Sequence, residues 1–380
     1  MKKFLASFVL SFLFLAFFAY LNPVRAQSFA APLTKNTYSK AKVVKIVNEG
    51  KKIEGEFTSF YQVVQVQILE GADKGKKVEV EQGGLIEITP QQLLKPGDDI
   101  VLLKSVTKDK TYYTMLDRYR LGGLIPILVG FFLLVIFIAG KKGFGSILGL
   151  IISLGIVLLF IVPQVLKGND PVFITIIGSL LIMLITMYLA HGISKKITVA
   201  VIATLAALGI TGVLASLFVD ISHLSGLGTE DASMLLMNPA NINMRGLLLA
   251  GIIIGALGVL DDITTSQSAT VFEIHHTDPK LPFTTLAKKG FNVGKEHIAS
   301  LVNTLVLAYA GASLSLFILF VINPAHQPYW VLLNSEIVVE EVIRTIAGSI
   351  GLVMAVPITT LLAAWVATSP RFKKSSLTKK

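Results

Sequence analysis

The chain has 380 residues, of which 53% are hydrophobic and only 15% are charged, and its formal net charge is +10 at pH 7. Soluble domains carry about 25% charged residues, so this composition excludes a simple cytosolic enzyme and a disordered chain. The absence of cysteine excludes disulfides and thiolate metal sites. An excess of basic residues can reflect binding to nucleic acid, binding to anionic lipid, or membrane topology. These three explanations differ in where the cations lie along the chain.

Residues 1–26 have the pattern of an export signal. Lys2–Lys3 precede an apolar run, Phe4–Leu21, and Asn22–Pro23 end it. Val24–Ala26 offers small residues at the −3 and −1 positions of a cleavage site. The run is also long enough for an uncleaved signal anchor. With or without cleavage, the sequence predicts that the next segment is exported.

Residues 27–120 are predicted to form a small exported β-domain. They hold nearly half of the chain's charges, and apolar and polar residues alternate along Tyr61–Ile68 and Val78–Glu81 around a turn at 71–75. Further alternating segments are Ile100–Val106 and Thr111–Thr114. Five or six short strands in this length favour a small closed barrel of the five-stranded OB type.

From Leu121 to residue 367 the sequence predicts a helical membrane bundle. Long apolar stretches alternate with short polar ones, and most are close to the 20 residues or so that cross a bilayer core of about 30 Å. The seven predicted spans are Leu121–Ala139, Phe144–Val162, Val172–Ala190, Ile197–Val219, Gly246–Leu260 and beyond, Ala299–Ile322 and Ile337–Val366.

Cation placement orients these spans. With the β-domain outside, 13 of the 16 Lys and Arg residues beyond residue 121 fall on the cytoplasmic side, including the basic tail 368–380. This is the pattern of the positive-inside rule. The sequence therefore predicts a multi-pass protein of the plasma membrane with a cytoplasmic C-terminus. The remaining cations form no basic patch large enough for nucleic acid.

The fifth predicted span carries two adjacent carboxylates, Asp261 and Asp262. Its purely apolar part, Gly246–Leu260, rises only about 22 Å as a helix, which is less than the bilayer core. The carboxylates are thus expected in the inner leaflet, with the helix continuing to Glu273. The alternative is a short helix whose carboxylates are exposed to water at the membrane interface.

One helical face joins small residues to these carboxylates. Gly251, Gly255, Gly258, Asp262 and Ser266 recur at helical spacing. Glycines at this spacing allow another helix to approach closely. Burial and like charge both disfavour ionisation of an adjacent carboxylate pair, which suits binding of a proton or a small cation.

Other polar residues in the spans are Asn303 in the sixth and Glu336, Glu340 and Arg344 in the seventh. Glu340 and Arg344 are four residues apart and are expected to form an ion pair at the outer end. The alternatives are an interfacial cap in which Arg344 reaches water, and for Asn303 one interhelical hydrogen bond rather than an ion site.

The remaining candidate site residues give weaker indications of a function. His275–His276 falls in a predicted cytoplasmic loop and is interpreted as solvated rather than as a metal site. Thr229 is expected to cap a short helix at 232–237. The sequence has no phosphate-binding glycine loop, zinc-protease motif or nucleophile elbow. No enzyme activity, cofactor or metal is therefore predicted.

Two blocks resemble a known family. Gly255–Gln267 (GALGVLDDITTSQ) and Glu340–Gly351 (EEVIRTIAGSIG), the latter followed by Pro357–Thr360, are similar to the YibE/F-like family of bacterial multi-pass membrane proteins. The resemblance extends over most of 121–367. It implies architecture and membrane location, and it supplies no mechanism.

Three functions are compared on this basis. The first is a secondary transporter or channel in which Asp261 and Asp262 bind a proton or cation, with Ser266, Asn303, Glu340 and Arg344 as further polar positions. The second is a membrane scaffold whose β-domain binds an envelope or secreted partner. The third, an intramembrane aspartyl hydrolase, is disfavoured because neighbouring residues point about 100° apart on a helix and cannot meet face to face.

Overall fold

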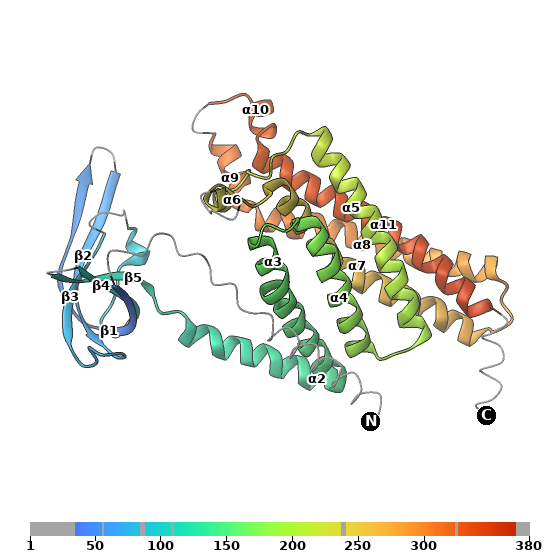
Figure 1. Cartoon of the computed structure of the whole chain (residues 1–380), viewed down its shortest axis with the longest axis horizontal. Coiled ribbons are helices and arrows are strands. Elements are labelled where there is room, and N and C mark those ends of the chain that lie inside the picture. The colour runs from blue at the N-terminus through green and yellow to red at the C-terminus, as the bar shows by residue number, and fades with distance from the viewer. Residues whose placement is uncertain are drawn as a thin grey trace. The chain divides into compact units, whose positions relative to one another are not determined.

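The computed structural model describes residues 35–54, 57–83, 88–107, 110–236, 241–323 and 326–369 (Figure 1). The predicted signal and nearly all of the basic tail lie outside these residues. The chain divides between Leu134 and Val135 into two compact units. The first contains all the strands, and the second contains most of the helices.

The first unit is a half-barrel of five antiparallel strands in the order β3-β2-β1-β4-β5. The 20-residue strand β1 pairs with β2 and with β4, and it is interrupted by irregularities between Val43 and Lys45 and between Ile46 and Asn48. Such bulges bend a strand and increase its twist, which lets one strand serve both halves of the sheet. The strands are β1 Lys35–Glu54, β2 Phe57–Ile68, β3 Lys77–Gln82, β4 Asp99–Thr107 and β5 Lys110–Arg118, with a short 3-10 helix, η1, at Pro90–Gln92.

The alternation of apolar and polar residues in the sequence agrees with the strand pairing in this sheet. Val64 faces Val80 and Val66 faces Val78 across the β2–β3 hairpin, which confirms the predicted hairpin. The inward residues of β1 to β4 form one buried cluster with Leu94, and the partly buried Tyr113 and Met115 of β5 pack against it. The expected closure into an OB-type barrel is not confirmed, because within the described residues no ladder joins β3 to β5.

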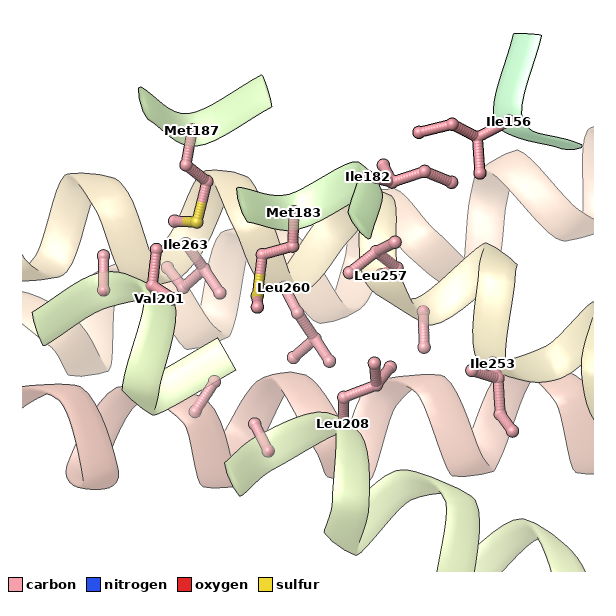
Figure 2. Close-up of a cluster of buried hydrophobic side chains, with 14 of the residues drawn as sticks. Ile156, Ile182, Met183, Met187, Val201, Leu208, Ile253, Leu257, Leu260 and Ile263 are labelled. Carbon is pink, nitrogen blue, oxygen red and sulfur yellow. The ribbon is translucent and has the colours of Figure 1, made fainter. Parts of the chain in front are cut away.

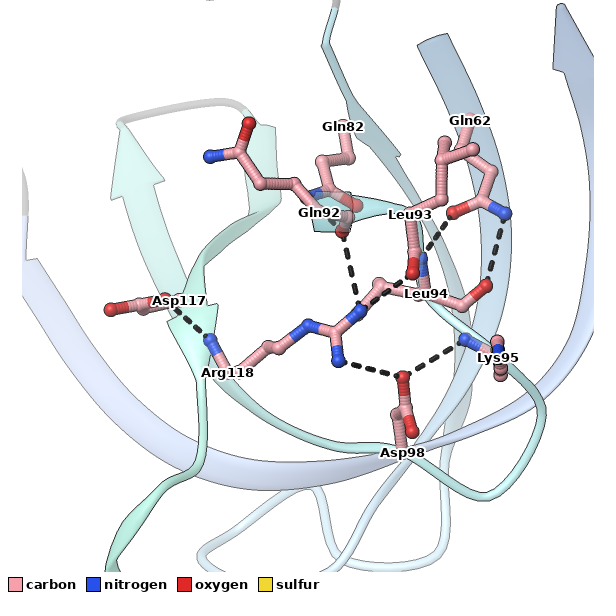
Figure 3. A network of polar contacts seen from close by, with 9 residues as sticks. All are labelled: Gln62, Gln82, Gln92, Leu93, Leu94, Lys95, Asp98, Asp117 and Arg118. Atoms are coloured by element: carbon pink, nitrogen blue, oxygen red, sulfur yellow. Dashed lines mark hydrogen bonds and ion pairs between the residues drawn. The ribbon is translucent and has the colours of Figure 1, made fainter. Parts of the chain in front are cut away.

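A buried amide anchors the segment that leads into β4. The Gln62 amide nitrogen donates to the Leu94 carbonyl oxygen at 3.1 Å, and the Leu94 N–H donates to the Gln62 side-chain oxygen at 2.9 Å (Figure 3). Arg118 donates to the Leu93 carbonyl oxygen at 2.6 Å and lies 3.5 Å from Asp98. Because Gln62 is buried, these two bonds replace the ones it would make to water.

An ion pair in this unit predicts a pH-dependent stability. The hydrogen bond from Lys104 holds the pKa of Asp73 below its usual range, and Tyr113 adds a second bond at 3.2 Å. The contribution of Asp73 should therefore be complete above about pH 4 and disappear as the pH falls through its lowered pKa. We expect Asp73→Asn to speed hydrogen exchange in β2 and β3 at pH 7, after correction for intrinsic rates, and to match wild type at the acid end. A constant difference across the pH range would contradict this.

The second unit is a helical bundle. Within the described residues five helices are long and apolar enough to cross a membrane, or six if the bent pair α8–α9 counts as one span. The helices are α2 Leu121–Ile156, continued by the π-helical turn η2 Val157–Ile161 and by α3 Val162–Leu166, then α4 Pro171–His191, α5 Lys195–Ile221, α6 Glu230–Leu236, α7 Met244–Thr277, α8 Phe283–Ala312, α9 Leu314–Ile322, α10 Tyr329–Leu333 and α11 Glu336–Thr368.

The predicted count of seven spans is therefore not confirmed. The stretch labelled α2 consists of two helices joined at a sharp kink, since Gly140 has non-helical backbone angles directly before Lys141 and Lys142, where the connection between two spans was expected. Helix α8 begins at Phe283, 16 residues before the predicted start of the sixth span. The early start of α8 arises because lysines and other polar residues end an apolar stretch but do not by themselves end a helix.

Helix α7 lies at the centre of the bundle core. Leu257, Leu260 and Ile263 from α7 meet Met183 and Met187 from α4 in a cluster that α5 also joins (Figure 2). Helix α11 approaches α5 very closely at Gly351. A Cβ added at this glycine would overlap the hydroxyl of Thr211. The residues expected to carry function lie on these same central helices.

Candidate functional site

Asp261 and Asp262 lie within one continuous helix. Helix α7 has 34 residues, and its N-terminus is capped by Asn243, whose side chain accepts from the Gly246 N–H at 2.9 Å. The helix continues for 15 residues beyond Asp262, to Thr277. The predicted continuation past the carboxylates to Glu273 is confirmed, and the loop of Ser and Thr residues in the short-helix alternative is wrong. The depth of the carboxylates in the membrane stays a prediction.

The two carboxylates have different surroundings. Asp261 is half-buried, whereas Asp262 is exposed on the face of α7 that also carries Gly255 and Gly258. The buried face of the helix is the opposite one. His191, at the end of α4, lies within electrostatic reach of Asp262. The pair thus presents one carboxylate to the protein interior and one to the surroundings of the helix.

The three glycines of this face make few contacts. An added Cβ would lie 3.3 Å from the Arg344 guanidinium at Gly251 and 3.5 Å from the Tyr309 hydroxyl at Gly255. At Gly258 it would meet no described atom within 4 Å. No described helix backbone packs on these glycines, so close packing there stays a prediction.

A layer of buried polar side chains begins one turn after the carboxylates, and the sequence interpretation missed it. The Thr264 hydroxyl lies 2.6 Å from that of Thr204 on α5, and the Ser268 hydroxyl donates to the Lys196 carbonyl oxygen at 2.7 Å. Thr204, Thr264 and Ser268 have no exposed surface. Hydrogen bonding makes their burial tolerable, and it ties α5 to α7 beside the carboxylates.

Gln267 extends this layer to two more helices. Its amide nitrogen donates to the Gly290 carbonyl oxygen of α8 at 2.9 Å and to the Thr360 hydroxyl of α11 at 2.7 Å. The approach depends on glycine, because a Cβ added at Gly294 would lie 3.1 Å from the amide nitrogen and oxygen of Gln267. The spacing of Leu286, Gly290 and Gly294, each four residues apart, is the sequence signal that could have revealed this contact.

Two predicted polar positions do not join the carboxylates. The Ser266 hydroxyl donates to the Ile263 carbonyl oxygen of its own helix at 3.1 Å. Asn303 is exposed on α8 and makes no side-chain hydrogen bond within the described residues. Their roles in ion binding therefore stay predictions.

At the other end of the bundle, the expected ion pair has a different partner. Arg344 Nε lies 3.4 Å from Glu341 Oε1, so the pairing is with Glu341 and not with Glu340. Glu340 is only 4% exposed and accepts from the Gly228 N–H at 3.1 Å. The predicted pairing of Arg344 with Glu340 is wrong, because the loop before α6 approaches α11 and its Gly228 N–H donates to the Glu340 carboxylate.

Glu336 is held by the same loop. One of its carboxylate oxygens accepts from the Ser225 N–H and hydroxyl at 2.7 Å each, from the Gly226 N–H at 2.9 Å and from the Leu227 N–H at 3.3 Å. Gly226 has a positive φ of 82°, and successive N–H groups in such a turn form a nest for an anion. We call residues 225–228 with Glu336 and Glu340 the carboxylate clasp.

The remaining predicted features lie on helices. Thr229 accepts from the Ala232 N–H at 3.2 Å, and α6 follows it, as expected. His275 and His276 are in the last turn of α7 and not in a loop, and His275 is only 8% exposed. Among the described residues no group of three His, Cys, Asp or Glu side chains is placed to hold a metal ion.

Comparison with known proteins gives one result. The family model described as YibE/F-like protein matches residues 127–369, which confirms the resemblance read from the two sequence blocks. No curated protein and no solved structure matches the chain. The match covers α7, its carboxylates, the buried polar layer and the carboxylate clasp.

Proposed function

The chain belongs to the YibE/F-like family, and from that premise we propose that it is a multi-pass membrane transporter or channel in which Asp261 and Asp262 form a proton or cation site. One observation carries the proposal: two adjacent carboxylates interrupt the apolar part of a continuous, centrally packed helix. Charge inside a spanning segment is costly, and by default it marks an ion or substrate path.

The depth of the carboxylates supports an inner-leaflet site. The bond from Ser268 to Lys196 sets the start of α5 level with Ser268. Asp262 precedes Ser268 by six residues, so it lies about 9 Å further into the bundle at the helical rise. If the lysines that begin α5 mark the membrane edge, as lysines do on the cytoplasmic side, Asp262 lies within the hydrocarbon region.

A topology of seven membrane spans is consistent with this depth. The helical stretch Leu121–Leu166 has 46 residues, or about 69 Å at the helical rise, which is more than twice the bilayer core. The backbone break at Gly140, followed by Lys141 and Lys142, is where two spans would meet on the cytoplasmic side. With the bent pair α8–α9 as one further span, the β-domain is extracytoplasmic, the C-terminus is cytoplasmic, and the protein resides in the cell membrane.

The chemistry available to the site follows from its neighbours. Asp261 is half-buried beside the polar layer, and Asp262 is exposed. A proton taken up by the half-buried Asp261 carboxylate removes a charge from low dielectric, and a small cation bound at either carboxylate would neutralise its charge. Movement of the ion would then bias the packing of α5, α7, α8 and α11, which the polar layer joins.

The substitution Asp262→Asn tests this proposal, with Asp261→Asn and the double variant beside it. In proteoliposomes with an internal pH dye, imposed proton, sodium and potassium gradients should give a flux in the wild type that each variant abolishes. Infrared difference spectra between acid and alkaline pH should also lose a protonated-carboxyl band. Glu273→Gln, an exposed position on the same helix face, is the matched control. Full flux in the Asp262→Asn variant would remove this function.

A membrane scaffold is the second candidate, and one observation favours it. The half-barrel leaves β3 and β5 as edge strands, and β5 exposes Tyr112 and Leu116 by about half. These two edges lie near each other without a ladder between them, and apolar side chains exposed at an unpaired edge are sites where another chain can bind. If the β-domain binds an envelope or secreted partner, deleting 27–118 should abolish function while Asp262→Asn preserves it. The transporter predicts that Asp262→Asn alone is sufficient to abolish it.

A further inference from the structure

An imidazole lies between Asp262 and the cytoplasmic ends of the helices. His191 is the last residue of α4, and only residues 192–194 separate it from Lys195, where α5 begins. The imidazole is exposed and lies within electrostatic reach of Asp262. Because Asp262 lies about 9 Å deeper than the start of α5 at the helical rise, His191 is on the cytoplasmic side of this carboxylate.

Three helices meet at His191. The hydroxyls of Tyr188 on α4 and Thr198 on α5 lie 3.1 Å apart and join these two helices at the cytoplasmic end. A Cβ added at Gly145, in the second half of α2, would lie 3.2 Å from the Leu189 carbonyl oxygen of α4. The surroundings of the imidazole are therefore built from α2, α4 and α5, with α7 contributing Asp262.

Two lysines act on the same imidazole. Lys142, just after the kink in α2, and Lys196, in the first turn of α5, both lie within electrostatic reach of His191. Together with Asp262 they are the charged groups through which the neighbouring helices act on His191 within the described residues. A metal cation that approaches Asp262 from the cytoplasm thus passes two positive charges that repel it. A proton can pass through the imidazole without any cation crossing this field.

The carboxylates also lack the ligands that a metal cation requires. Hard cations such as Mg²⁺ and Ca²⁺ take about six to eight oxygen ligands. Asp261 and Asp262 point about 100° apart on α7, so they do not present their oxygens to one point. The hydroxyls of Thr264 and Ser268 are directed to α5, and that of Ser266 to its own helix. A proton, in contrast, needs only one carboxylate oxygen.

We propose that the ion of this site is a proton and that His191 exchanges it between the cytoplasm and Asp262. This inference rests on the proposed function of the carboxylate pair and names its ion. An imidazolium that gives its proton to the Asp262 carboxylate is left as a neutral imidazole and takes the next proton from cytoplasmic water. The reverse sequence releases a proton. Both side chains are exposed, so water reaches both, and the charge of histidine changes between about pH 5 and 8.

The test uses the full-length protein in proteoliposomes with an internal pH dye, and tracer sodium and potassium in parallel. The wild type should carry protons and neither metal ion. His191→Ala should lower the proton flux by about a hundredfold, the lower end for loss of a positioned proton donor. It should also lose the inflection between about pH 5 and 8. Imidazole added to both sides of the membrane should restore much of the flux, which a purely structural role of His191 would not allow.

Two controls accompany this rescue. His276→Ala removes an exposed histidine from the last turn of α7 and should carry protons like the wild type, with or without imidazole. The double variant His191→Ala/Asp262→Asn reports the leak caused by imidazole itself, and it should not be rescued.

The outcomes separate this inference from the function on which it rests. Sodium or potassium uptake by the wild type at the rate of protons would overturn the inference and leave an ion-transport function in place. Wild-type flux in His191→Ala, or a loss that imidazole does not restore, would overturn the role of His191. A wild type that carries no ion would overturn the proposed function itself, and the inference with it.

Discussion

Replacing Gln267 with glutamate is expected to destabilise the helical bundle by more than about 3 kcal/mol, the order found when a buried polar group loses its partner or a buried charge has none. The amide nitrogen of Gln267 is the donor in both of its bonds, to the Gly290 carbonyl oxygen and to the Thr360 hydroxyl. An ionised carboxylate cannot donate, and a protonated carboxyl group has a single O–H for the two bonds. The ionised group would place an oxygen against a carbonyl oxygen at a position with no exposed surface.

The measurement is the midpoint temperature of unfolding of the full-length protein in detergent, followed by the fluorescence of Trp330 and Trp365. Both tryptophans of the chain are in the helical unit, so this signal does not report on the β-domain. Asn292→Asp is the matched control, since it makes the same amide-to-acid change at an exposed position of α8. If both variants unfold at the same temperature, the bonds of Gln267 do not hold the three helices together.

Helix α7 illustrates what can be predicted from sequence. Its course past Asp261 and Asp262 follows from the lack of proline or glycine until Pro279, and the structure continues the helix to Thr277. The β2–β3 hairpin is predictable for a similar local reason, the period of two in 61–68 and 78–81. In both cases neighbouring residues along the chain decide the outcome.

The buried polar layer could not be predicted in this way. Thr204, Thr264, Gln267 and Thr360 are ordinary helix residues along the sequence, and only the packing of α5, α7 and α11 reveals that they meet. The clasp is similar, because the partner of Glu340 is a loop 112 residues earlier in the chain. A local rule at spacing of four assigned Arg344 to Glu340, and a tertiary contact overrode it.

Removing the carboxylate of Glu336 is expected to release the loop that it binds. In Glu336→Ala, the N–H groups of Ser225, Gly226 and Leu227 lose the acceptor that they share. Hydrogen bonds to a charged group contribute about 1.5–3 kcal/mol each, although this loop is partly exposed and water will replace part of the loss. We expect amide exchange in residues 222–236 to rise by about tenfold to a hundredfold, which corresponds to roughly 1.4–2.8 kcal/mol of local stability.

Two further variants separate the charge of Glu336 from its shape. Glu336→Gln retains an acceptor oxygen of the same reach, so its exchange rates should fall between those of wild type and Glu336→Ala. Glu296→Ala removes an exposed carboxylate from α8, away from the clasp, and should leave 222–236 unchanged. If Glu336→Ala exchanges like wild type in this loop, then the backbone turn at Gly226 is stable by itself and the carboxylate only occupies it. If instead Glu336→Gln matches Glu336→Ala, the negative charge and not the oxygen is what the three N–H groups require.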